Sequence, residues 1–148
     1  MSEVPGSSDA DFSIVNADEV EDAYAGDTEV PGEFRALTDA LGSEQVAITL
    51  IRIPPHSDFE QGTGHLHEHQ EELYLVARGT LTMRFGDEVR EVGAGSVARV
   101  APQTVRSHRN EGDEPVEMWA ISVKSEDSDS EKVDDFWETS REARQSGA

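Results

Sequence analysis

The sequence predicts an all-β protein, built as a sandwich or a barrel of short strands. About eight strand-like segments follow one another at intervals of roughly 8–12 residues, with turn signals between them. One segment alternates cleanly and places Leu81, Met83 and Phe85 on a single face. Gly86 and Asp87 follow it directly, a pair that is typical of a two-residue hairpin turn.

The expected elements are short, and most are apolar and rich in β-branched residues. In chain order, eight strands are expected, at residues 45–53, 65–67, 71–77, 80–85, 88–92, 96–100, 105–109 and 116–123. Residues 12–15 and 34–37 are two further candidates for short strands, the first of them for an edge strand. Residues 18–24 fit a helical turn or two. Turns between the strands are expected where Gly, Pro, Asn and Asp gather, because these residues adopt turn conformations at low cost.

We expect one barrel, because the chain of 148 residues suffices for one core and contains no internal repeat. Residues 1–30 are interpreted as an acidic N-terminal extension, residues 31–123 as the barrel and residues 124–148 as an acidic C-terminal tail. Phe136 and Trp137 are the apolar residues of that tail, and we expect them to dock it onto the barrel or onto a second subunit.

The charge is strongly negative: 32 acidic residues face 12 lysines and arginines, for a net charge of −20. Such a surface suits either capture of a cationic partner or solubility in high salt, where ions screen the repulsion. Acid excess along the whole chain, with scarce lysine, favours the second interpretation and a halophilic source. Binding to a nucleic-acid backbone is not expected at this charge.

The composition also bears on compartment. The chain has no cysteine, which excludes disulfides and thiolate metal ligands and fits a reducing cytoplasm. Its first residues lack the positive and apolar regions of a signal peptide, and no apolar run has the length of a membrane span. A cytoplasmic protein without membrane contact is therefore expected.

The segment with the most chemical information runs from Gly64 to Tyr74. His65 and His67 are two residues apart, so on a strand their side chains point to the same face. Glu72 follows shortly after them. Two imidazoles and a carboxylate that converge on one point can hold a divalent metal ion.

The same residues resemble the cupin superfamily of small jelly-roll barrels. The first cupin motif is matched by His65, His67, Glu72 and Gly79 at the family's spacing, although Phe59 stands where the motif begins with Gly. The second motif is matched by Gly95 and Asn110. Three of its positions depart from the pattern: Ala101 replaces Pro, Gln103 replaces Gly and Arg106 replaces the histidine.

The resemblance implies that His65, His67 and Glu72 are ligands of a divalent metal such as Fe, Mn, Zn or Ni. The fourth family ligand is the histidine that Arg106 replaces. A guanidinium stays protonated and has no lone pair to donate, so Arg106 cannot be a ligand.

Three arrangements are compatible with this departure. In the first, the three remaining ligands suffice and Arg106 clamps an anionic substrate over the metal. In the second, His108 takes the fourth place. Because His108 lies ~6.6 Å further along the strand, this requires a bulge or a different position of the metal. In the third, no metal is bound and Arg106 forms a salt bridge with Glu72.

The expected function is binding of a divalent metal and a small polar or anionic organic ligand, such as a carboxylate. As an enzyme, the protein would use Arg106 on the substrate and Tyr74 or His108 in proton transfer. Dioxygenase, decarboxylase, isomerase and lyase chemistry are all open, because the fold does not specify the reaction. The alternative is a binding or sensing module without catalysis, with Arg106 paired to Glu72. Cupins commonly pair through their sheets, so a homodimer is also expected.

Overall fold

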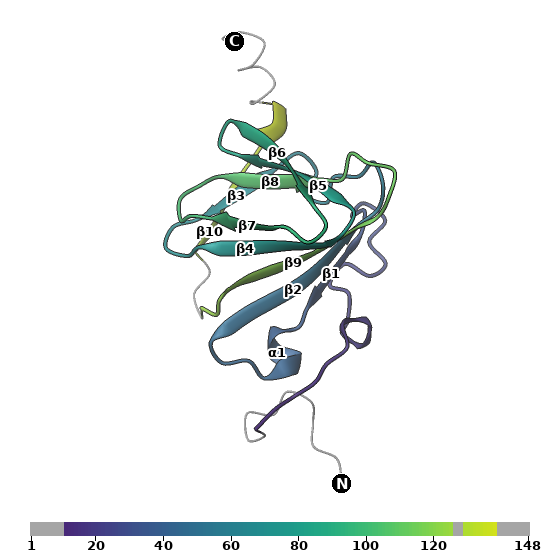
Figure 1. The fold of residues 1–148 in the computed structure, drawn as a ribbon, viewed down its shortest axis with the longest axis vertical. Helices are drawn as coiled ribbons and strands as arrows, with labels where there is room; N and C mark the ends of the chain where they lie inside the picture. The colour runs from purple at the N-terminus through teal and green to yellow at the C-terminus, as the bar shows by residue number, and fades with distance from the viewer. Residues whose placement is uncertain (1–10, 126–128, 139–148) are drawn as a thin grey trace.

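The computed structural model describes residues 11–125 and 129–138, and within these residues the protein is all-β (Figure 1). The elements are the 3₁₀ helix η1 (Ala17–Glu19), β1 (Glu33–Ala36), α1 (Thr38–Leu41), β2 (Val46–Ile53), β3 (Gly64–His67), β4 (Glu72–Arg78), β5 (Thr80–Phe85), β6 (Glu88–Gly93), β7 (Val97–Val100), β8 (Arg106–Arg109), β9 (Val116–Val123) and β10 (Ser130–Val133). No helix within this part of the chain is long and apolar enough to span a bilayer.

The described strands form two five-stranded sheets in the orders β1-β2-β9-β4-β7 and β10-β3-β8-β5-β6. All pairings are antiparallel, and the sheets face each other as a jelly roll. The predicted fold class is therefore confirmed. The core lies between the sheets, where alternate residues of each strand meet. In the first sheet the inward row includes Ile51, Met118 and Val76, which are cross-strand neighbours and are buried.

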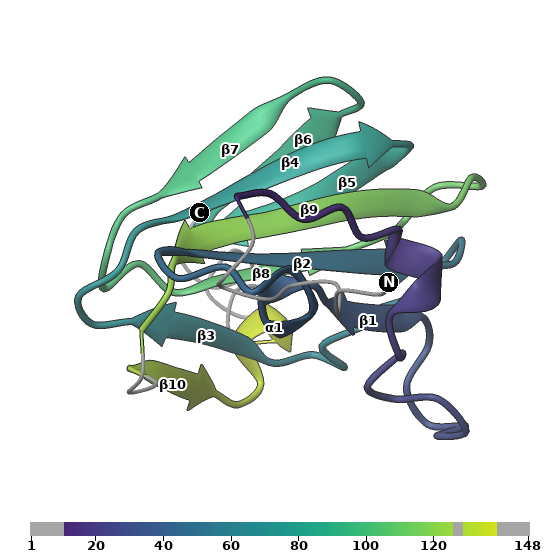
Figure 2. The ribbon, with the colours of Figure 1, turned by 90° about the horizontal axis from the view of Figure 1, so that it is seen from below.

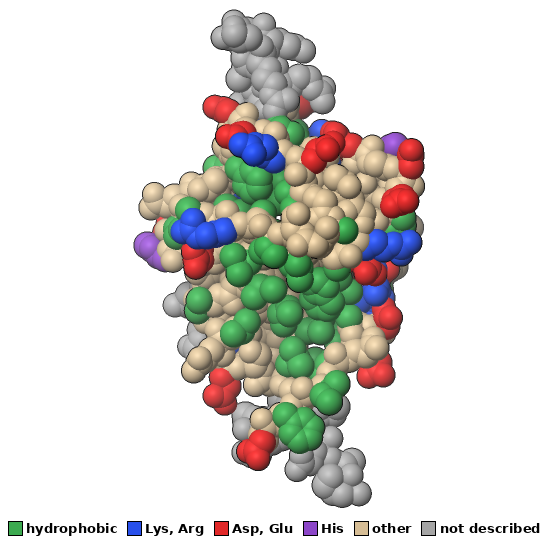
Figure 3. Space-filling model, in the orientation of Figure 1, with side chains coloured by type: hydrophobic (Ala, Val, Ile, Leu, Met, Phe, Trp, Pro, Cys, Tyr) green, Lys and Arg blue, Asp and Glu red, His purple; other side chains and the backbone are tan. Residues whose placement is uncertain are grey.

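The outward face of the first sheet is also apolar. Leu50, Trp119, Leu75 and Val97 follow one another across β2, β9, β4 and β7. Figure 3 shows apolar side chains gathered over these strands, and Val97 is 56% exposed. The homodimer stays a prediction, and this face has the apolar surface that such pairing requires.

Most expected strands are present with bounds that differ by one residue at an end, and β5 and β9 have the expected bounds. The edge strand expected at residues 12–15 is not formed. Ser13 donates its hydroxyl hydrogen to the carbonyl of Leu41 instead, and Phe12 and Ile14 stay largely exposed. Of the helical turn expected at 18–24, only the short η1 is present, with Asn16 as its N-cap.

The segment 124–148, interpreted as a tail, contributes a strand to the barrel. β10 pairs with β3 at the edge of the second sheet, and both views place them side by side (Figures 1 and 2). Phe136 and Trp137, expected to dock this segment, are 6% and 7% exposed. The polar sequence of β10 gave no strand signal, because its residues are largely exposed and its pairing alone defines the strand.

Candidate metal centre

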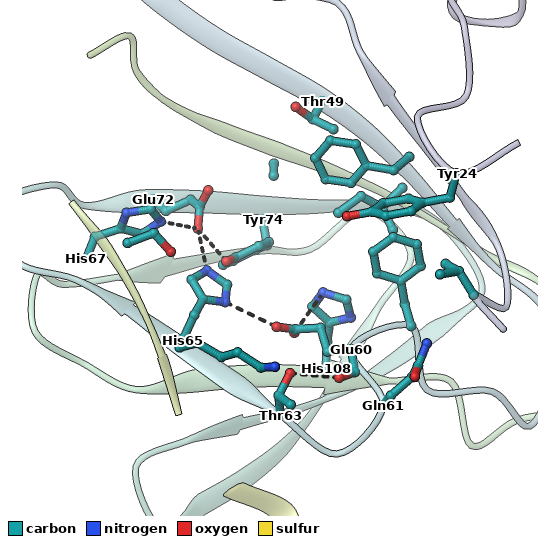
Figure 4. Close-up of a pocket in the computed structure, with 17 residues that line it drawn as sticks. Tyr24, Thr49, Glu60, Gln61, Thr63, His65, His67, Glu72, Tyr74 and His108 are labelled. Carbon is teal, nitrogen blue, oxygen red and sulfur yellow. Dashed lines mark hydrogen bonds and ion pairs between the residues drawn. The ribbon is translucent and has the colours of Figure 1, made fainter. Parts of the chain in front are cut away.

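His65, His67 and Glu72 bring their metal-binding atoms together inside the barrel. The two histidines lie on β3 in one sheet, and Glu72 begins β4 in the other. One ligand atom from each residue lies within 4.8 Å of the others. The Nε2 atoms of His65 and His67 are 3.8 Å and 3.7 Å from Oε1 of Glu72 (Figure 4). These distances leave the three side chains converging on one small volume.

Each imidazole is oriented by a carboxylate on its other nitrogen. Nδ1 of His65 lies 3.2 Å from Oε2 of Glu60, and Nδ1 of His67 lies 2.8 Å from Oδ1 of Asp129. A carboxylate accepts hydrogen bonds, so Nδ1 donates in both rings. In a neutral ring Nε2 then carries the lone pair and faces Glu72. Carboxylate-oriented histidines of this kind are typical of metal ligands, so the residues present fit a divalent ion.

Arg106 lies on β8 directly opposite His65, and its side chain is fully buried. Its guanidinium donates to Oε1 of Glu72 at 2.8 Å, to the hydroxyl of Tyr74 at 3.2 Å and to the carbonyl of Thr104 at 3.1 Å. It is not among the described residues that line the cavity. This arrangement therefore favours a structural role for Arg106, in the salt bridge with Glu72, over the expected role as a clamp on the substrate.

The buried charges around Glu72 determine its ionisation. Burial raises the pKa of Glu72, but hydrogen bonds from His65, Tyr74 and Arg106 outweigh burial and lower this pKa to about 2. Burial and the adjacent Glu72 carboxylate raise the pKa of Tyr74 well above its ordinary value. The Tyr74 hydroxyl keeps its proton and donates a hydrogen bond to Glu72, so it acts as a hydrogen-bond donor rather than as a base. Glu72 is therefore ready to bind a cation at any ordinary pH.

The electrostatics of His65 predict how metal binding depends on pH. Burial lowers the pKa of His65, but the Glu60 and Glu72 carboxylates outweigh burial and raise it to about 9. Below pH 9 the His65 ring therefore carries a second proton, which a metal ion must displace in order to bind. Metal binding in this pH range releases that proton. We expect the affinity for Zn²⁺ to rise by about tenfold per pH unit from pH 7 to pH 8.5.

Calorimetric titrations with Zn²⁺ at several pH values, in buffers that differ in ionisation enthalpy, measure both the affinity and the proton released. His69→Ala is the matched control, because His69 is exposed and its ring faces only Glu68. The control should keep the wild-type pH slope. An affinity that does not change with pH would contradict the protonated state of His65.

His108 lies on β8 but does not join the three ligands. Its Nε2 is 3.2 Å from Oε1 of Glu60, and its Nδ1 is buried without a hydrogen-bond partner among the described residues. The bulge that would shift His108 toward the fourth ligand position is not present, because β8 pairs with β5 in continuous register. His108 instead belongs to a second cluster around Glu60.

Glu60 is one of the site residues that the sequence did not reveal; Asp129 is another. It lies in the loop before β3, and its carboxylate faces His65, His108 and the hydroxyl of Ser107. Burial raises the pKa of Glu60, but His108 and His65 outweigh burial and the pKa lies below its ordinary value. No spacing rule separates Glu60 from the other acidic residues of the loop, since only the fold brings it between two histidines (Figure 4).

The candidate metal ligands, together with Glu60 and His108, line one end of a cavity of about 740 Å³. The other end is apolar and aromatic. Phe34 and Phe59 stack with ring centroids 6.1 Å apart, and Tyr24 contacts both rings edge-on. Figure 4 shows Tyr24 across the cavity from His67. Tyr24 comes from the segment interpreted as an extension, so residues before the barrel also shape the cavity.

The jelly roll and its inward His-His-Glu set define the class of protein. The cupin domain model matches residues 49–123, and the chain belongs to this family. Gln103, which replaces the glycine of the second motif, adopts the left-handed conformation with φ of 68° that a glycine would favour.

Proteins that are similar to this chain include three that are described as isomerases. The chain is 37% identical over 92 residues to "H2HPP isomerase" of Bacillus subtilis, a match that covers 61% of this chain and 35% of that protein. It therefore spans about a third of that relative's length. A candidate sugar phosphate isomerase from Acidithiobacillus ferrooxidans is 25% identical, with a TM-score of 0.57 over 64% of this chain and 60% of the other. A sugar phosphate isomerase of the cupin superfamily from Silicibacter pomeroyi shares the fold, with 18% identity and a TM-score of 0.62 over 76% of each chain.

Proposed function

We propose that this cupin binds a divalent metal through His65, His67 and Glu72 and catalyses an isomerase-type reaction on a small organic anion. One observation carries the proposal. Both imidazoles are turned by carboxylates so that their Nε2 atoms face the Glu72 carboxylate. The three carboxylates of this centre, Glu72, Glu60 and Asp129, supply enough negative charge to balance a divalent ion together with Arg106.

The metal, when bound, would act as a Lewis acid that polarises a carbonyl or hydroxyl oxygen of the ligand. The protein contributes the remaining functions. Arg106 and Tyr74 hold Glu72 ionised and in place through their hydrogen bonds. Glu60 orients His108, and His108 lines the cavity, so its imidazole is the candidate group for accepting a proton from the ligand and returning it.

The cavity favours a ligand with an anionic end and an apolar part. The polar end holds the proposed metal ligands, and the exposed Lys132 adds a positive charge to the cavity wall. Phe34, Phe59 and Tyr24 offer ring faces and edges at the other end. An aromatic 2-oxo acid meets both requirements, and its ring offers the aromatic end more apolar surface than a sugar phosphate does. The isomerase names of the relatives support the reaction type.

Elemental analysis of the purified protein tests the metal, with His67→Ala as the comparison. We expect stoichiometric divalent metal in the wild type, and about a hundredfold weaker binding of added Zn²⁺ or Mn²⁺ in His67→Ala, since one of three ligands is lost. His69→Ala serves as the control and should retain metal. Equal metal content in wild type and His67→Ala would contradict the assignment.

Ligand binding tests the substrate class. Metal-loaded protein is titrated with phenylpyruvate, pyruvate and fructose 6-phosphate, and proton exchange on the bound ligand is followed by NMR in D₂O. The proposal expects the aromatic acid to bind most tightly and to exchange protons.

The second candidate function is a binding module without metal, supported by the salt bridge between Arg106 and Glu72. It expects no metal in the purified protein and ligand binding that chelator does not change.

A further inference from the structure

Residues 129–138, here called the C-terminal arm, follow the matched cupin segment and lie along the metal centre. The strand β10 of this arm pairs with β3, where Ser130 is the neighbour of His67 and Lys132 is the neighbour of His65. Both residues of the arm also line the cavity. The arm is therefore next to each of the two candidate histidine ligands.

Asp129, the first residue of the arm, makes the closest contacts with the centre. Its Oδ1 is 2.8 Å from Nδ1 of His67, and its Oδ2 accepts a hydrogen bond of 2.8 Å from the backbone amide of His69. One carboxylate thus holds both the ring of His67 and the backbone just after it. Among the described residues, no other side chain forms a hydrogen bond with Nδ1 of His67.

The far end of the arm is anchored by two aromatic residues. Phe136 packs under the guanidinium of Arg84, 3.8 Å from the ring centroid, and so close to Gly64 that a Cβ there would lie 2.6 Å from the Phe136 ring. The guanidinium carbon of Arg109 lies 4.2 Å from the ring centroid of Trp137. Phe136 and Trp137 are buried in these contacts, so they hold the arm against β3, β5 and β8.

The anchor also reaches the second histidine. The indole nitrogen of Trp137 donates to the hydroxyl of Ser107 at 2.9 Å. This hydroxyl lies 3.3 Å from Oε1 of Glu60, and Glu60 in turn orients Nδ1 of His65. The arm thus supports His67 directly through Asp129 and His65 indirectly through Ser107 and Glu60.

We propose that the C-terminal arm completes the metal centre and that Asp129 is a positioning residue, which orients His67 so that Nε2 faces the metal. This inference rests on the proposed metal binding. Partners that orient a metal-bound histidine typically change metal affinity by about 10–100-fold when they are removed.

Asp129→Asn tests the inference, because it removes the charge and keeps the size of the side chain. Asp134→Asn is the matched control, because it makes the same chemical change in the same arm. Asp134 is exposed and forms an ion pair with Lys132. Both variants and the wild type are titrated with Zn²⁺ at fixed pH. Hydrogen exchange at the amides of β10 reports in parallel whether the arm stays docked.

We expect Asp129→Asn to bind Zn²⁺ at least tenfold more weakly with the β10 amides still protected, while Asp134→Asn binds as the wild type does. An affinity within threefold of wild type in Asp129→Asn overturns the positioning role. A loss of affinity accompanied by unprotected β10 amides also overturns it, because release of the whole strand would then explain the loss. Failure of the wild type to bind Zn²⁺ overturns both the metal centre and this inference, whereas normal binding in wild type and Asp129→Asn overturns the inference alone.

Discussion

Arg106→Leu is expected to lower the free energy of unfolding of the metal-free protein by about 3–5 kcal/mol. The guanidinium is fully buried and is the charged partner of Glu72. Its loss leaves the Glu72 carboxylate, the Tyr74 hydroxyl and the Thr104 carbonyl each without one hydrogen-bond donor. Removal of one member of a buried pair costs far more than the pair itself contributes, because the remaining charge is stranded away from water.

Urea unfolding followed by circular dichroism measures this loss, in chelator so that metal does not contribute. Arg99→Leu is the control. Arg99 lies on the barrel strand β7 and also pairs with a glutamate, Glu71, but the Arg99 side chain is 62% exposed. It should change stability by no more than about 1 kcal/mol. If Arg106→Leu costs no more than the control, the buried salt bridge is not what stabilises this end of the barrel.

Gly79→Ala is expected to cost about 4 kcal/mol, the second large effect. Gly79 joins β4 to β5 with φ of 78°, a conformation that costs a residue with a Cβ about 1–3 kcal/mol. A Cβ at this position would also lie 2.4 Å from the backbone oxygen of Pro115, and overpacking of this kind costs about 1–3 kcal/mol more. The backbone of Pro115 cannot rotate away as a side chain would.

Two other glycines separate these contributions in the same unfolding measurement. Gly86 has φ of 57° and open space around its Cβ position, so Gly86→Ala should show only the backbone strain. Gly93 has neither feature, and Gly93→Ala should stay within about 0.5 kcal/mol of wild type. Equal costs at Gly79 and Gly86 would show that the contact with Pro115 contributes nothing.

The strands of the barrel could be predicted because their signal is local. Alternation over residues 80–85 and the Gly86-Asp87 turn indicate a hairpin without reference to distant residues, and β5 and β6 form it. The failures occurred where local signal and tertiary environment diverge. Residues 12–15 are apolar enough for a strand, but none of the described strands pairs with them. β10 has a polar sequence, but the free edge of β3 accepts it.

The metal ligands could be proposed for a similar reason. His65 and His67 share a face through the period of a strand, and Glu72 follows at the spacing of the cupin motif. Their partners could not be proposed in this way. Asp129 reaches His67 from 62 residues away, and the Glu60 carboxylate that orients His65 is itself contacted by Ser107 from 47 residues away. Sequence spacing contains no information on such contacts, because they depend on how the two sheets and the arm pack.

By itself, then, the sequence determined the all-β class, the family and the residues that can donate to a metal, because each of these depends on residue type and short-range periodicity. The tertiary structure decided the state of those residues. It enclosed the guanidinium of Arg106 with Glu72, placed Glu60 between two histidines and brought the C-terminal arm against His67. These are long-range contacts between buried charges, and burial and distance are properties that only the folded chain has.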